Sequence, residues 1–386
     1  MKIDPYKHDA RWQAWKEKFR SGIPGISQIN SGLLLNYLFD MEKGINISST
    51  SVKGSRSCMR LNNLKSRLFF LMSQVERRYQ LLDTSKLKEE QLLDLFSAMR
   101  NGEIKTRENK IYKSVQDYAK NFKAFWHWYQ KVNRKKGIDI PDITIDLDTS
   151  GNKPDWVYLT EEQIRELCEK AKYGYKVLMM FLFDTGIRAP TELVNIRVAD
   201  LSQDCKELNI RDEISKTFGR RIKLLLCTNL LKDYIKDNNL TSNDYLFPIS
   251  PVVVNRYLKR LGRKLFGDIE SLAGQKYSEL TMYDFRHNAC CYWLPRYKSE
   301  SALKYRFGWK NSDKIHYYSE LLGMKDTISE DDLLVDITKT EIEQKLAKSE
   351  KEKEIIQERL NRVEEELKIV LGRLNITNTK FGMVHA

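Results

Sequence analysis

Residues 175–188 read YKVLMMFLFDTGIR, a run that is apolar on nearly all sides and ends in a Thr-Gly turn and an arginine. Such a run predicts a buried helix over 175–183, because it leaves no polar stripe for solvent. Arg188 directly after it cannot easily join the core, so it stands where a rigid element ends and can point at a ligand. Glu192 follows four residues later, on the expected next helix, and is placed to orient Arg188.

The regions on either side of this run predict a compact domain with a small sheet. Upstream, Thr160 and Gln163 have the spacing of a capping box and predict a helix through residue 171. Downstream, 207–210 and 221–226 have the pattern of strands, joined by a hairpin turn over 215–220. Lys216 lies in that turn, where a lysine can reach over a substrate and deliver a proton. Lys223, on the second strand, is a weaker rival.

A third motif, Thr281-Met282-Tyr283-Asp284-Phe285-Arg286-His287, predicts the start of another helix. Residues three apart share a helix face, so Tyr283 and Arg286 are expected to point the same way, with Thr281 as cap. His287 is adjacent to Arg286 but points about 100° away on an ideal helix.

A fourth motif places Trp309 after Phe307-Gly308 and Tyr318 nine residues further on, within Ile315-His316-Tyr317-Tyr318-Ser319. Tyr317 competes with Tyr318 as a reactive phenol. The register from Trp309 and the small residue that follows favour Tyr318. His316 lies near this phenol and is either a helper or a surface residue.

These motifs resemble the catalytic domain of the tyrosine recombinase or phage integrase family over about 160–320. The family order is Arg, Lys, His-x-x-Arg, His or Trp, and Tyr, and here it corresponds to Arg188, Lys216, Tyr283-x-x-Arg286, Trp309 and Tyr318. Tyr283 stands where the family usually has histidine, and with a free pKa near 10 a phenol is a poor base at neutral pH. The family's acidic residue usually follows the first arginine by three positions, whereas Glu192 follows Arg188 by four.

The chemistry suits breakage and rejoining of DNA. Two guanidinium groups can hold the oxygens of a phosphodiester and stabilise charge at phosphorus, and a tyrosine can form a phosphotyrosine that is readily reversed. A lysine can protonate the departing 5′-oxygen. In the family, the position of Trp309 contacts the scissile phosphate. We therefore expect a site-specific recombinase or integrase that needs neither a metal nor a cofactor. The alternatives are a topoisomerase-like or telomere-resolvase-like tyrosine enzyme, and an inactive DNA-binding relative.

The region before this domain is helical in pattern, with amphipathic stretches over 59–79, 87–99 and 111–132. Its aromatic face over 111–132 is interpreted as bundle core rather than as a base-stacking platform. Lysines and arginines flank these faces, which fits a surface that grips phosphates. By family likeness this region is a core-binding domain, and it would form a C-shaped clamp on double-stranded DNA together with the catalytic domain.

The expected fold class is mainly α with a small β-sheet. The domain boundaries that we predict are an N-terminal segment 1–50, a core-binding domain 51–133, a linker 134–157, a catalytic domain 158–336, a coiled-coil tail 337–375 and a tail end 376–386. The tail has apolar residues at alternating steps of three and four among Glu, Lys, Gln and Arg, a heptad pattern that favours helix pairing. We expect a homo-oligomer, a tetramer on DNA by family likeness, and a possible coiled-coil partner through 337–375.

Composition agrees with a polyanionic partner. The chain has 386 residues with 66 Lys+Arg against 53 Asp+Glu, a net charge of +13, which raises the local concentration of nucleic acid. Its six cysteines form no C-x-x-C pair, so a zinc site and a disulfide framework are both poorly supported. The first twenty residues are polar and the longest apolar run is too short to span a bilayer. We expect a cytoplasmic protein, on a prokaryotic nucleoid or in a host cytoplasm.

Overall fold

The computed structural model describes residues 2–45, 54–151, 153–297 and 299–322, with scattered positions between 349 and 363. Two compact units divide the chain, Met1–Asn288 and Ala289–Ala386. Most of the predicted coiled coil at 337–375, and all of the predicted tail end at 376–386, lie outside the described residues. The described positions between 349 and 363 are helical.

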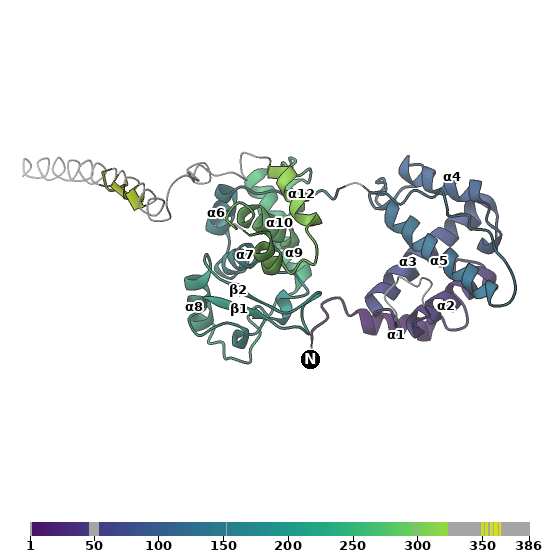
Figure 1. The fold of residues 1–386 in the computed structure, drawn as a ribbon, viewed down its shortest axis with the longest axis horizontal. Helices are drawn as coiled ribbons and strands as arrows, with labels where there is room; N and C mark the ends of the chain where they lie inside the picture. The colour runs from purple at the N-terminus through teal and green to yellow at the C-terminus, as the bar shows by residue number, and fades with distance from the viewer. Residues whose placement is uncertain are drawn as a thin grey trace, which may run out of the picture. The chain divides into compact units, whose positions relative to one another are not determined.

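The first unit begins with a set of helices that share one hydrophobic core (Figure 1). They are α1 (His8–Lys18), α2 (Gln28–Lys43), α3 (Cys58–Tyr79), α4 (Glu89–Arg100) and α5 (Val115–Arg134), with the 3₁₀ turn η1 (Thr84–Lys86) before α4. Ser27 and Ser57 cap α2 and α3 by accepting a backbone N–H in the first turn.

This core includes residues from the predicted N-terminal segment. Trp12 of α1 and Leu34 of α2 are fully buried in the same cluster as Leu68 and Phe122. The aromatic face of α5 is also buried, which confirms its interpretation as core. A single hydrophobic core therefore spans Trp12 to Leu147, and the domain boundaries drawn from the sequence remain predictions.

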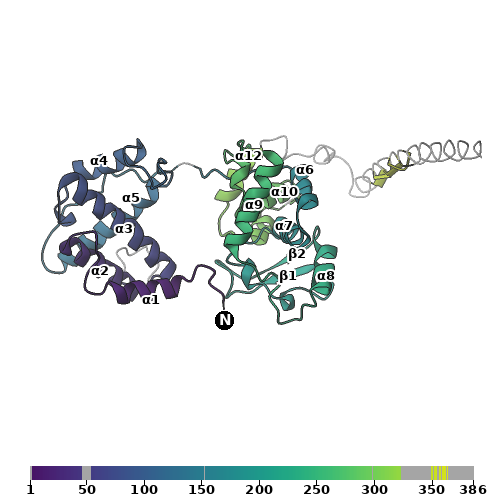
Figure 2. The same cartoon turned by 180° about the vertical axis from the view of Figure 1, so that it is seen from behind.

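The rest of the first unit contains the short hairpin and further helices (Figure 2). Its elements are α6 (Glu161–Lys170), α7 (Tyr173–Thr185), η2 (Leu193–Asn195), η3 (Val198–Asp200), β1 (Glu207–Ile210), β2 (Arg220–Lys223), α8 (Thr228–Asp237), α9 (Pro251–Phe266) and η4 (Tyr277–Glu279). Strands β1 and β2 pair antiparallel, with Glu207 opposite Lys223 and Ile210 opposite Arg220. Thr160 and Gln163 form the predicted capping box of α6.

The second strand ends earlier than the sequence predicts, and the reason is a buried carboxylate. The predicted strand 221–226 stops at Lys223, because Asp184 at the end of α7 accepts the backbone N–H groups of Leu225, Leu226 and Cys227 at 2.9, 2.7 and 3.1 Å. These N–H groups are then unavailable to a sheet partner. The link fixes the end of α7 to the segment that leaves the hairpin.

Helix α10 (Met282–Trp293) runs across the boundary between the two units, and α11 (Glu300–Phe307) and α12 (Asp313–Leu322) follow in the second unit. Of the six cysteines, Cys58 is half-buried and the other five are buried. Within the described residues, none of the helices has the length and apolar character needed to cross a membrane.

Candidate active site

Arg188 is held by a buried carboxylate. Gly186 ends α7 in the left-handed conformation, with φ 59°, and the chain then turns back so that Glu192 lies against Arg188. Glu192 is fully buried and accepts from the Arg188 backbone N at 2.9 Å and from its Nη1 at 3.0 Å. Glu192 precedes the 3₁₀ turn η2 and not the expected α-helix. Glu192 still orients Arg188, because it holds both the backbone and the guanidinium group of this residue.

Arg220 is a member of this site that the sequence did not reveal. It opens β2, its side chain is fully buried, and its Nη2 and Nη1 donate to Glu192 at 2.8 and 3.2 Å. Burial raises the pKa of Glu192, but the hydrogen bonds and charges of Arg220 and Arg188 outweigh it and hold this pKa below its usual value. The carboxylate therefore stays charged and serves two guanidinium groups. One sequence signal could have indicated its burial: side chains alternate along a strand, so Arg220 lies on the same face as the apolar Ile222.

Arg286 joins this cluster from α10. It is buried, and its Nη1 donates to the carbonyl oxygen of Gly186, two residues before Arg188. Burial and then the like charge of Arg188 lower the pKa of Arg286 to about 10, with Glu192 opposing them. Arg286 therefore keeps its charge at neutral pH. Two crowded guanidinium groups backed by one carboxylate favour binding of a further anion.

The start of α10 is capped by its own aspartate. The Asp284 carboxylate accepts from the backbone N and the hydroxyl of Thr281 at 2.7 and 2.6 Å, so the Thr281 hydroxyl is a donor here. Asp284 also accepts from the backbone N of Val157 at 3.0 Å, which ties the beginning of the domain to α10. Burial raises the pKa of Asp284, although these three donors oppose the rise.

Tyr283 is exposed, with 48% of its surface accessible. Its ring meets His287 edge to face at 5.1 Å, and His287 stacks on Trp156 at 4.8 Å. The phenol of Tyr283 acts on Arg286 electrostatically, so the two residues three apart do lie near each other. His287 is therefore packed between the rings of Tyr283 and Trp156.

Lys216 is exposed in the segment between β1 and β2. A hydrogen bond stabilises this segment after Lys216, because the Asp212 carboxylate accepts from the backbone N–H of Gly219 at 2.6 Å. A Cβ at Gly219 would lie 2.9 Å from the carbonyl oxygen of Ile210, so the close turn requires glycine. Lys223, the rival, is also exposed and lies on β2 itself.

Trp309 and Tyr318 come together in the second unit. Gly308 ends α11 in the left-handed conformation, with φ 62°, and Trp309 follows directly. The Trp309 ring stacks with that of Tyr318 on α12, with centroids 6.0 Å apart and planes 15° apart. Tyr318 is buried at 4% exposure, Tyr317 is half-buried, and His316 is exposed. Tyr318 is thus the tyrosine that packs with Trp309.

Five of the six predicted site residues form two groups, while Lys216 lies in the exposed segment between β1 and β2. Arg188 and Arg286 gather around Glu192, with Tyr283 beside Arg286, in the first unit; Trp309 and Tyr318 gather in the second. The joining of these groups around one phosphate stays a prediction. The described residues hold no group of three or more His, Cys, Asp or Glu able to bind a metal ion.

A basic hollow of about 570 Å³ lies along α9 beside the start of α10. Arg256, Arg260 and Arg263 are exposed on this helix. Asn255 accepts the backbone N–H of Met282 at 3.0 Å, which joins α9 to the helix that carries Arg286. The hollow is suited to a polyanion that reaches toward the arginine cluster.

Comparisons with known proteins agree on the fold. The integrase of transposon Tn1549 in complex with a circular intermediate DNA matches at 15% identity with a TM-score of 0.55, over 79% of this chain and 98% of that one. XerH recombinase bound to a palindromic difH substrate matches at 13% identity and 0.53, over 82% and 92%. A lambda integrase dimer bound to a core site matches at 14% and 0.52, over 81% and 79%.

A search of the curated proteins finds no match. The family model described as the phage integrase family matches residues 157–324, which include every predicted site residue. Residues 157–324 therefore resemble the catalytic domain of the phage integrase family, and this match supports a tyrosine-type DNA recombinase.

Proposed function

We propose that this protein is a site-specific recombinase that cleaves and rejoins double-stranded DNA through a 3′-phosphotyrosine. The observation that carries the proposal is the pair Arg188 and Arg286, two guanidinium groups crowded around the buried Glu192. A phosphodiester supplies the anionic oxygens that such a pair binds. The similar solved structures include an integrase in complex with a circular intermediate DNA and one bound to a core site, which supports DNA as the substrate class.

In this mechanism, Arg188 and Arg286 hold the non-bridging oxygens and stabilise the charge that develops at phosphorus. The Tyr318 oxygen forms a bond to phosphorus while the bond to the 5′-oxygen breaks, and the phenol passes its proton to solvent water. Lys216 protonates the departing 5′-oxygen. Tyr283 and Trp309 donate hydrogen bonds to phosphate oxygens. The reverse steps rejoin the strand, and the chemistry requires neither a metal nor a cofactor.

The test is covalent trapping on a nicked duplex that loses its short 5′-hydroxyl fragment after cleavage. We expect Tyr318→Phe to abolish the covalent product and to retain DNA binding. Tyr317→Phe is the matched control, because it removes the neighbouring hydroxyl from the same helix, and it should still form the product. If the covalent product still forms with Tyr318→Phe but not with Tyr317→Phe, then Tyr317 is the nucleophile. If the product forms with both variants, the proposed mechanism through either tyrosine is wrong.

Two finer points belong to the same proposal. The enzyme would act where prokaryotic or host DNA is accessible, in the cytoplasm, as an oligomer on its DNA sites. Exchange between two specific duplexes would separate a recombinase from a tyrosine enzyme that only relaxes DNA or resolves hairpin ends. The heptads at 337–375 would strengthen the oligomer.

A further inference from the structure

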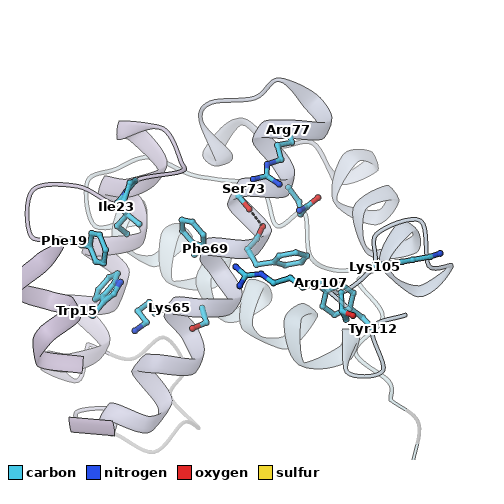
Figure 3. A pocket seen from close by; sticks show the side chains of 15 residues that line it. Trp15, Phe19, Ile23, Lys65, Phe69, Ser73, Arg77, Lys105, Arg107 and Tyr112 are labelled. Carbon is cyan, nitrogen blue, oxygen red and sulfur yellow. Dashed lines mark hydrogen bonds between the residues drawn. The ribbon is translucent and has the colours of Figure 1, made fainter. Parts of the chain in front are cut away.

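A hollow of about 640 Å³ lies among the N-terminal helices, remote in sequence from every residue of the proposed active site (Figure 3). It is lined from α1, from the segment after it, from α3 and from the loop between α4 and α5. Its volume falls within the range of about 300–1,000 Å³ that is usual for sites of small ligands. It has room for one or two residues of a polymer, but not for a DNA duplex.

Flat aromatic rings line this hollow. Phe69 of α3 is half-buried and central in it, while Trp15 and Phe19 lie on one side and Tyr112 on the other (Figure 3). Trp15 already stacks on Trp12 and carries the Lys65 ammonium 5.0 Å from its ring centroid. The ring centroids of Tyr112 and Phe70 are 5.4 Å apart. Phe69, by contrast, has no aromatic partner among the residues that the structure describes, and its half-buried side chain lines the hollow.

Positive charge surrounds these rings. Lys65 and Arg77 lie four residues before and eight after Phe69 on one face of α3, Arg107 projects from the loop, and Lys105 marks the outer edge. None of these four cations forms an ion pair within the described part of the chain, whereas Arg67 and Arg78 of the same helix pair with Asp117 and Asp94. The lining contains no carboxylate.

We propose that this hollow, the Phe69 groove, binds an unpaired nucleotide of a DNA strand. The base would stack on Phe69, and the flanking phosphates would pair with Lys65, Arg77 and Arg107. Rings that take base faces beside cations that take phosphates are the usual means of binding single strands. A duplex cannot use the groove in this way, because its base faces are covered by neighbouring bases.

The choice of DNA as the polymer rests on the proposed function, because strand exchange must unpair bases near the cleavage point. An acidic peptide would satisfy the cations equally well. The planar ring of Phe69 and the small volume favour a nucleotide over a peptide helix. The groove is a separate site from the basic hollow along α9 and from the arginine cluster.

The test measures the affinity of the full-length protein for a short labelled oligothymidine by fluorescence anisotropy. Phe69→Leu keeps an apolar side chain but removes the planar ring, and we expect it to weaken single-strand binding about tenfold, since base stacking contributes about 1–3 kcal/mol. The matched control is Phe39→Leu, at a half-buried phenylalanine of α2 outside the groove, which should bind normally. Affinity for a duplex of the same sequence should not change in either variant.

A charge test supplements the ring test. Arg77→Glu with Arg107→Glu should weaken single-strand binding far more than Lys135→Glu with Lys136→Glu, an equal change of charge at exposed positions outside the groove. Equal losses from the two pairs would overturn the proposal. If Phe69→Leu weakens duplex binding as much as single-strand binding, the groove binds a duplex and the proposal is wrong. If thymidine monophosphate competes as well as the oligonucleotide, the groove binds a free nucleotide. If polyglutamate competes as well, the groove binds an acidic peptide.

The two proposals can fail separately. Phe69→Leu should still form the covalent product on the nicked duplex, because Tyr318 is untouched. Loss of the product in Tyr317→Phe instead of Tyr318→Phe would change the active site but not the result of the binding assay.

Discussion

At the residue scale, the candidate site depends on one carboxylate, Glu192, which two arginines share. Its side chain and that of Arg220 have no exposed surface, and Arg188 is 14% exposed. A buried charge that loses its partner is strongly destabilising, by about 3–5 kcal/mol, whereas an exposed ion pair contributes about 0–1 kcal/mol. The position of Glu192 therefore matters for stability as well as for the orientation of Arg188.

We expect Glu192→Gln to lower the free energy of unfolding by about 3–5 kcal/mol, because it leaves two guanidinium groups without their counter-charge. Urea unfolding at neutral pH measures this change. Glu213→Gln is the matched control, since Glu213 is 60% exposed and pairs with Arg211 at the surface, and it should cost less than about 1 kcal/mol. Similar losses in the two variants would contradict the buried network.

The same variant has a consequence for pH dependence. Because the folded pKa of Glu192 is lowered, its contribution to stability is fully present above the unfolded value, about 4.3, and is lost as the pH falls through the folded pKa. The stability of the unmodified protein should therefore fall more steeply in acid than that of Glu192→Gln. Parallel acid limbs in the two unfolding series would show that Glu192 does not titrate in this way.

Sequence reasoning identified Arg188, Arg286 and Tyr318 because each stands in a local motif with a recognisable setting. It missed Arg220, because it placed this residue in the hairpin turn over 215–220, where a charged side chain is usually exposed. Its burial depends on Glu192, which is 28 residues away in the chain and reaches it only through the fold. The strand period can mark Arg220 as facing inward, but it does not identify Glu192 as its partner.

At the element scale, two helix-interior glycines test how closely the helices pack. In α9, a Cβ on Gly262 would lie 2.3 Å from the carbonyl oxygen of Tyr277 in η4, whereas in α2 a Cβ on Gly32 would meet nothing within 4 Å. Alanine is better than glycine in a helix interior by about 0.8–1.0 kcal/mol. Gly32→Ala should therefore raise the melting temperature, while the backbone overlap should outweigh this gain in Gly262→Ala and lower it.

Both measurements use thermal unfolding followed by circular dichroism, and each variant is the control for the other. A rise in melting temperature for Gly262→Ala would show that α9 and η4 do not pack as closely as described. Since α9 carries Arg256, Arg260 and Arg263, a shift of this helix should also weaken DNA binding, which Gly32→Ala should leave unchanged.

Elements with a strong internal pattern could be predicted from the sequence, and those set by tertiary contacts could not. The buried helix at 175–183 corresponds to α7, and the capping box at Thr160 starts α6 as expected. The predicted helix 111–132 starts instead at Val115, because Ile111 pairs with Lys105 in an isolated bridge. Helix α2 extends over Gln28–Lys43, because Ser27 caps it upstream and Gly44 ends it.

At the scale of the whole molecule, the proposed reaction requires groups from both compact units. The arginine cluster lies in Met1–Asn288, whereas Tyr318, the proposed nucleophile, and Trp309 lie in Ala289–Ala386. The trapping experiment therefore tests more than the identity of the nucleophile. Covalent product from the intact chain requires that Tyr318 and the arginines act on one phosphate, from the same copy or from two copies.

The tail should set the assembly of these copies. Ile356, Leu360 and Val363 fall on the heptad positions and are exposed by 63%, 50% and 53%, and burying each apolar side chain against a second helix would contribute about 1.5–3 kcal/mol. Removal of the residues after 336, or Ile356→Asp with Leu360→Asp, should therefore shift the protein toward monomer and impair synapsis of two DNA sites. Sedimentation velocity measures the first effect and a bridging assay with two labelled duplexes measures the second. Gln357→Asp with Asn361→Asp adds the same charge off the heptad positions and should leave both unchanged; if the tail variants behave like this control, the heptads do not pair copies of the chain.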